Sequence, residues 1–181
     1  MKKNNYQKRL LKAIPGGAHT YSKGYDQYPS NAPEILDKGK GCYVYDSKGE
    51  KYLDYGMALR AVNIGYSENI IDKGAIKQIK KGNNLTRASL IELEAAELMV
   101  KQINSVDMVK FTKNGSTAVS AGIKLARAYN GRDLIARCKQ HPFFSYDDWF
   151  IGNTNIKKGI PKSIQKLTKV YKDELPKGLL S

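Results

Sequence analysis

The sequence predicts an α/β fold, in which neighbouring parallel strands are joined by a crossover helix. Two observations support this prediction. An amphipathic helical pattern covers residues 117–130, and it lies between short apolar strands at 107–112 and 134–137. Gly131 stands where the C-terminal cap of the helix is expected. In a sheet of this kind, ligands bind at the carboxyl ends of the strands.

The first third of the chain predicts a helix, an irregular arm and a hairpin. A short basic helix covers residues 1–14 and ends at Pro15-Gly16-Gly17. Residues 18–34 are rich in Tyr, Ser, Gly and Pro without periodicity, so we expect an arm. Two strands at 42–46 and 51–55 flank a turn and form a hairpin. Because two strands alone are marginally stable, the hairpin is expected to pack on a larger body.

Two further helices and one aromatic loop complete the predicted elements. Residues 68–81 have the apolar spacing of a helix, and Ser89 with Glu92 matches the capping box that opens another. Residues 141–150 form the most aromatic segment, and its proline and polar interruptions favour a loop. A loop that follows a strand end can place a ring across a ligand.

The turn before the helix at 117–130 is the candidate binding site. It contains Asn114, Gly115 and Ser116. Free N–H groups and the positive end of the helix dipole suit a phosphate group there. Gly115 allows close approach of the backbone, and the Ser116 and Thr117 hydroxyls can donate to phosphate oxygens. The same residues also fit an ordinary helix N-cap, so the turn by itself leaves both interpretations open.

The charge of the chain raises nucleic acid as a candidate partner. The 181 residues carry a net charge of +14, and positive charge favours phosphate backbones. However, only six of the 31 basic residues are arginine, and the lysines are spread along the chain. No zinc-finger spacing or RNA-binding signature accompanies them. We therefore do not expect a nucleic-acid function, and an absence of binding at low ionic strength would exclude it.

The remaining composition favours a cytoplasmic protein without a metal. The apolar stretches are too short to cross a membrane, and the basic N-terminus lacks the apolar segment of a secretory signal. The two cysteines, Cys42 and Cys138, have no metal-binding or redox spacing.

Several motifs occur together in an order that resembles one family. They are Pro15-Gly16-Gly17, the hairpin residues 45–55, the turn 113–116 and the helical run 123–133. This ordered set resembles the N-terminal part of class III pyridoxal-phosphate aminotransferases, in particular the glutamate-1-semialdehyde aminomutase-like group. The resemblance implies the type I aminotransferase fold in truncated form. Residues 1–85 would be the arm, hairpin and helix of the small domain, and 86–181 the first βαβ part of the large cofactor-binding domain.

The resemblance also implies pyridoxal 5'-phosphate as cofactor. In the family, a glycine and a hydroxyl residue before the crossover helix hold the cofactor phosphate. They correspond to Gly115 and Ser116 here, with Asn114 beside them. An aromatic ring in the loop after the next strand stacks on the pyridine, commonly within a Tyr-His-Gly run. This chain lacks that run, and Phe143 is the stacking candidate; Phe keeps the stacking surface without the hydroxyl.

Two departures from the family pattern concern the substrate. The aminomutase carries an arginine that pairs with the substrate carboxylate, and counting from Pro15 places Lys23 there. Lysine supplies charge without a bidentate fork, and a solvated loop lysine is an equal interpretation. The family usually has a tryptophan-containing stretch after the hairpin. This chain has Met57-Ala58-Leu59-Arg60-Ala61 there instead. Both changes argue against glutamate-1-semialdehyde and favour another amino or keto compound, a sugar being one option.

No catalytic residue is assigned. In the family, the aspartate that pairs with the pyridine nitrogen and the Schiff-base lysine belong to the part beyond residue 181. We expect this chain alone to be inactive, as the front fragment of a homodimeric enzyme whose C-terminal half is encoded separately or cut off. That enzyme would move an amino group between small amino and keto or aldehyde compounds. The alternative is a non-catalytic binding or assembly protein. The neighbouring reading frame would discriminate the two.

Overall fold

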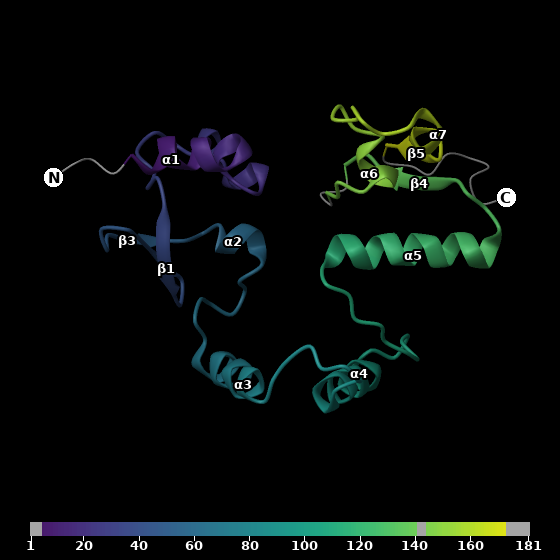
Figure 1. Cartoon of the computed structure of the whole chain (residues 1–181), viewed down its shortest axis with the longest axis horizontal. Coiled ribbons are helices and arrows are strands. Elements are labelled where there is room, and N and C mark those ends of the chain that lie inside the picture. The colour runs from purple at the N-terminus through teal and green to yellow at the C-terminus, as the bar shows by residue number, and fades with distance from the viewer. Residues whose placement is uncertain (1–4, 141–143, 173–181) are drawn as a thin grey trace. The chain divides into compact units, whose positions relative to one another are not determined.

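The computed structural model describes residues 5–140 and 144–172. The chain divides into two compact units, Met1–Arg87 and Ala88–Ser181, and each is described by itself (Figure 1). The assignment of residues 1–85 and 86–181 to a small and a large domain stays a prediction.

The first unit begins with the predicted helix and arm. Helix α1 covers Tyr6–Ala13, and the Asn5 side chain accepts a hydrogen bond from the Lys8 N–H at its start. A 3₁₀ turn at Pro15–Gly17 follows, in which both glycines have positive φ angles. The arm contains two more 3₁₀ turns, which cover Tyr21–Lys23 and Tyr25–Gln27.

An antiparallel sheet of three strands follows the arm. Its strands are β1 (Leu36–Lys40), β2 (Tyr43–Asp46) and β3 (Lys51–Leu53), in that spatial order. The predicted hairpin is confirmed as β2–β3, and the Asp46 carboxylate closes its turn by accepting the N–H groups of residues 48 and 50. Strand β1 was not predicted, and it gives the hairpin its third strand.

Tyr66 fastens the chain after the sheet onto strand β1. Its backbone forms a two-way bridge with Gly41, with N···O distances of 2.9 and 2.8 Å. Its ring lies against Gly39, where an added Cβ would come within 2.5 Å of the ring. Glycine is therefore required at position 39. Between the sheet and Tyr66, the short turn α2 (Met57–Arg60) has positive φ angles at all four residues.

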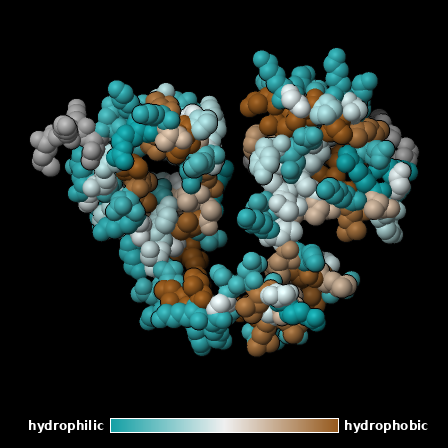
Figure 2. Space-filling model, in the orientation of Figure 1, coloured by the Kyte–Doolittle hydropathy of each residue, from teal (hydrophilic) through white to brown (hydrophobic). Residues whose placement is uncertain are grey.

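Two exposed helices lie on either side of the boundary between the two units in the sequence. The first unit ends with one of them, and the second unit begins with the other. Helix α3 covers Asn69–Lys80, and α4 covers Leu90–Gln102, with the predicted Ser89–Glu92 capping box present. Neither helix buries a residue. Figure 2 shows apolar side chains on the surface of both helices.

The second unit contains the predicted long helix and a parallel strand pair. Helix α5 covers Gly115–Asn130 and ends at Gly131, whose φ of 65° gives the left-handed cap that was predicted. Strands β4 (Ile135–Cys138) and β5 (Thr168–Tyr171) pair in parallel. The short helices α6 and α7 lie between them in sequence, at Asp148–Ile151 and Lys162–Gln165.

One prediction for this unit was wrong, and another was right only in part. Residues 107–112 do not form a strand, because no strand of the described residues pairs with them; the parallel partner of β4 is β5. The aromatic segment is not wholly a loop, since residues 148–151 form α6 and Phe150 is buried. The Phe150 ring packs edge-on against Trp149 and Phe144, with centroids 5.5 and 5.8 Å away. Burial of apolar surface favours this helical turn over an open loop.

Candidate functional site

The turn before α5 is built around the Asn114 side chain. Its Oδ1 atom accepts hydrogen bonds from the Thr117 N–H at 2.9 Å and from the Thr117 hydroxyl at 3.1 Å. The Thr112 hydroxyl donates to the Asn114 carbonyl oxygen at 3.0 Å. Asn114 is therefore the N-cap of α5, and its side-chain oxygen is already used. The Thr117 hydroxyl, predicted as a phosphate donor, instead donates to this cap.

Gly115 and Ser116 occupy the first two helical positions after this cap. Within the described part of the chain, their N–H groups and the Ser116 hydroxyl have no hydrogen-bond partner. Apart from its chain neighbours and the backbone of its own helix, no atom of the described residues lies within 4 Å of a Cβ added to Gly115, so the space in front of the backbone is open. Two N–H donors and one hydroxyl at the positive end of a helix dipole are a donor set that fits a phosphate group.

A polar network attaches the segment after β4 to the middle of α5. The Ser120 hydroxyl donates a short hydrogen bond to Asp147 Oδ2 and accepts one from Trp149 Nε1–H at 3.0 Å. The Ser145 hydroxyl also donates to Asp147 Oδ2, at 3.0 Å, and Ser145 is fully buried. Sequence reasoning missed this network because Ser120 and Asp147 are 27 residues apart.

The predicted stacking residue, Phe143, lies outside the described residues, so its role stays a prediction. Its neighbour Phe144 is exposed over more than half of its surface, and its ring contacts Phe150.

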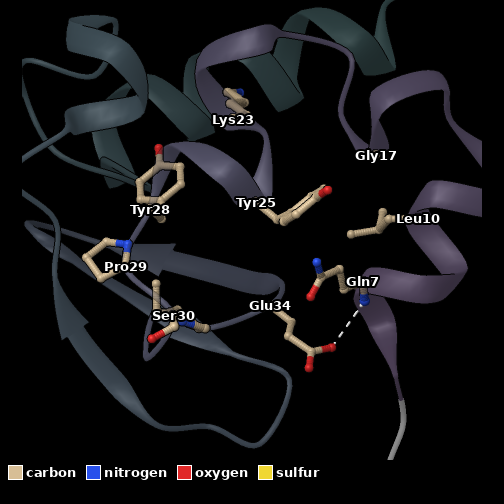
Figure 3. Close-up of a pocket in the computed structure, with 11 residues that line it drawn as sticks. Gln7, Leu10, Gly17, Lys23, Tyr25, Tyr28, Pro29, Ser30 and Glu34 are labelled. Atoms are coloured by element: carbon tan, nitrogen blue, oxygen red, sulfur yellow. Dashed lines mark hydrogen bonds between the residues drawn. The ribbon is translucent and has the colours of Figure 1, made fainter.

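Lys23 lines a pocket of about 370 Å³ in the first unit, between α1 and the arm (Figure 3). The Tyr25 ring points toward Leu10 of α1, and Glu34 accepts a hydrogen bond from the Gln7 N–H at 3.1 Å. The pocket therefore offers a cation, a carboxylate and aromatic surface. Lys23 belongs to the first unit and the 114–116 turn to the second.

A second polar contact that the sequence did not predict joins Asp54 and Tyr66. The Tyr66 hydroxyl donates to Asp54 Oδ2 at 2.6 Å, and Asp54 Oδ1 accepts the N–H groups of Gly56 and Met57. The hydrogen bond from Tyr66, with these N–H groups, lowers the pKa of Asp54. The same hydrogen bond to the carboxylate raises the pKa of Tyr66 to about 12. This pair fixes the turn α2 beside the sheet.

Comparison with known proteins identifies the family. The model of the class III aminotransferases matches residues 25–177, which is most of the chain. The chain belongs to this family. The predicted resemblance is thus confirmed.

Individual relatives agree with this assignment and differ in named activity. The glutamate-1-semialdehyde 2,1-aminomutase of Wigglesworthia glossinidia brevipalpis is 30% identical over 93% of this chain and 42% of its own length. The 3-aminobutyryl-CoA aminotransferase of Cloacimonas acidaminovorans is 32% identical over 83% of this chain and 35% of its own length. The chain therefore spans less than half the length of these relatives.

A solved structure confirms the predicted fold class. The pyridoxal-phosphate internal aldimine form of the FumI protein from Sphingopyxis sp. MTA144 superposes with a TM-score of 0.81 and 28% sequence identity. The match covers 92% of this chain and 39% of that one. The described residues thus form part of a transaminase fold. None of the helices that they form has the length and apolarity needed to cross a membrane.

Proposed function

We propose that this chain supplies the phosphate-binding part of a pyridoxal-phosphate-dependent aminotransferase. The supporting observation is the start of α5, where Asn114 caps the helix and leaves the donors of Gly115 and Ser116 open. When bound, pyridoxal phosphate supplies the electron sink for exchange of an amino group. The residues of this chain would hold its phosphate by backbone N–H groups and a hydroxyl.

Pyridoxine 5'-phosphate is the probe for this proposal, because it has the phosphate and ring without the reactive aldehyde. It therefore reports the binding site without adducts on the many lysines of the chain. We expect equilibrium dialysis to detect binding of pyridoxine phosphate, with pyridoxine itself binding much more weakly.

Gly115→Ala and Gly122→Ala form a matched pair for the test. Both glycines lie in α5, and neither added Cβ meets an atom of the described residues outside the helix's own backbone and the chain neighbours within 4 Å, so both variants keep the helix. A methyl group at position 115 occupies the space that the phosphate would enter, whereas position 122 is nearly two turns away. We expect Gly115→Ala to weaken pyridoxine phosphate binding on the order of tenfold or more. Gly122→Ala should leave it unchanged. Equal affinities in the two variants would instead support the plain N-cap interpretation.

The substrate side of the proposal rests on the pocket that contains Lys23. A lone lysine attracts a carboxylate but cannot form the two parallel hydrogen bonds of an arginine. The relatives named above act on different compounds by their names, which supports a transfer between an amino compound and a keto or aldehyde compound without naming either one. Glutamate-1-semialdehyde is disfavoured as substrate by Lys23 and by the residues at 57–61.

We further propose that the 181-residue chain is inactive by itself and acts with the segment that corresponds to the remaining length of its relatives, as a homodimer in the cytoplasm. The inactivity is testable with pyridoxal phosphate and borohydride. We expect only scattered, substoichiometric labelling of lysines, because none of them lies in the family's Schiff-base context. One pyridoxyl group per chain on a single lysine, found by peptide mass spectrometry, would contradict this part of the proposal.

A further inference from the structure

Helix α5 is partly covered along a single stripe. Four of its residues, Ser116, Ser120, Ile123 and Arg127, are half-buried, and its other residues are exposed. Their spacing of three to four residues places them on one face of the helix. Ser120 therefore lies about one turn from Ser116, roughly 6 Å along the helix axis. What covers Ser120 is thus near the open donors at the helix start.

The segment after β4 provides this cover. Asp147 Oδ2 accepts the hydroxyl groups of both Ser120 and Ser145, and Trp149 Nε1–H donates to Ser120 Oγ. The segment is also anchored to the strand pair, since the Thr168 hydroxyl of β5 donates to the Trp149 carbonyl oxygen at 2.7 Å. Hydrogen bonds between side chains and backbone thus join α5, the segment 144–149 and the strand pair.

We infer that Ser120 and Asp147 are positioning residues for an aromatic organic phosphate bound at the α5 N-terminus. They hold the segment 144–149 against the same helix face as Ser116. The organic group of a phosphate bound at Gly115 and Ser116 would then lie beside this segment, which the hydrogen bonds hold in place. The inference rests on the proposed function, because it adds a role for ring positioning to the phosphate site.

Variants at Ser120 separate this role from general stability. Alanine has a higher helix propensity than serine, so Ser120→Ala does not weaken the helix through propensity. It removes the donor to Asp147 and the acceptor for Trp149. Ser120→Thr keeps a hydroxyl although threonine is the poorer helix former. We expect Ser120→Ala to lower pyridoxine phosphate affinity about tenfold, and Ser120→Thr to retain most of it. Inorganic phosphate, measured as a competitor, should bind both variants as it binds the parent chain.

Asp147 and Asp148 provide a second, independent comparison. They are adjacent carboxylates, but only Asp147 accepts the serine hydroxyls, and Asp148 is exposed. Removal of a negative charge near an anion site should strengthen anion binding by electrostatics alone. We expect Asp147→Ala instead to weaken pyridoxine phosphate binding, and Asp148→Ala not to weaken it. Trp149, the single tryptophan of the chain, reports the network directly, and its emission should shift in Ser120→Ala and in Asp147→Ala.

The outcomes distinguish this inference from the proposed function. If the parent chain binds no pyridoxine phosphate, the proposed function fails, and the positioning role fails with it. If the parent binds it and Ser120→Ala binds it equally well, only the positioning role is overturned. An equal loss for pyridoxine phosphate and inorganic phosphate would also overturn that role, because it would indicate a general structural effect.

Discussion

The turn α2 concentrates unfavourable backbone conformations in four residues that include no glycine. Met57, Ala58, Leu59 and Arg60 have φ angles from 44° to 71°. A left-handed conformation costs an L-residue about 1–2 kcal/mol. The Asp54 carboxylate offsets part of this cost, since Oδ1 accepts the Gly56 and Met57 N–H groups and Oδ2 accepts the Tyr66 hydroxyl. The strained turn at residues 57–60 and the Asp54 carboxylate that stabilises it are therefore close together in the sequence.

Two alanine-to-glycine substitutions measure this strain. Ala58 has a φ of 48°, whereas Ala61, three residues later, has a φ of −83° in the right-handed region. Both substitutions add the same freedom to the unfolded chain, but only Ala58→Gly relieves a left-handed conformation. We expect Ala58→Gly to be more stable than Ala61→Gly by about 1–2 kcal/mol in the free energy of unfolding. Urea unfolding followed by circular dichroism would measure this difference. Equal stabilities would show that α2 carries no strain.

Helices were predictable from the sequence because their signals are local. The Ser89–Glu92 capping box and the Gly131 cap are each encoded within one turn of a helix end, and both are present. Strands were less predictable, because a strand exists only where another strand pairs with it. The run 107–112 has apolar residues but no described partner, while β1 (Leu36–Lys40) has little apolar pattern and is defined by its pairing with β2.

The candidate site divides in the same way. The helix start at 114–116 was predictable, since a capping residue followed by a glycine and a hydroxyl residue is a local pattern, and its role in holding a phosphate stays a prediction. Contacts between distant residues left no such pattern. Ser120 meets Asp147 across 27 residues, and Asp54 meets Tyr66 across 12. Lys23 was proposed from the family resemblance alone, and the structure adds that it lines a pocket.

Across the residues that the structure describes, few apolar side chains are buried. Val44 in the first unit and Phe150 in the second are the buried apolar side chains of the described residues. Helix α4 is apolar on several faces, yet Leu90, Leu93 and Leu98 are each more than half exposed. A helix with apolar residues on several faces is normally covered by neighbouring elements on those faces. Surfaces of this kind in water favour association.

We therefore expect the 181-residue chain to self-associate in a concentration-dependent manner, as measured by sedimentation and light scattering. Its net charge of +14 opposes association by repulsion. Added salt screens that repulsion, so association should increase with ionic strength, the opposite of the salt dependence of nucleic-acid binding.

Substitutions at apolar and at polar positions of α4 test whether its apolar surface causes the association. Replacing Leu90 and Leu98 together with glutamine removes exposed apolar surface, and we expect it to reduce the association. Replacing Glu94 and Glu97 with glutamine introduces the same side chains on the same exposed helix without removing apolar surface. It also removes two negative charges, so the comparison is made at high ionic strength, where repulsion is screened and association should persist. A monodisperse monomer at all concentrations and salt levels would contradict the expectation. It would require that these apolar side chains be covered within the chain itself.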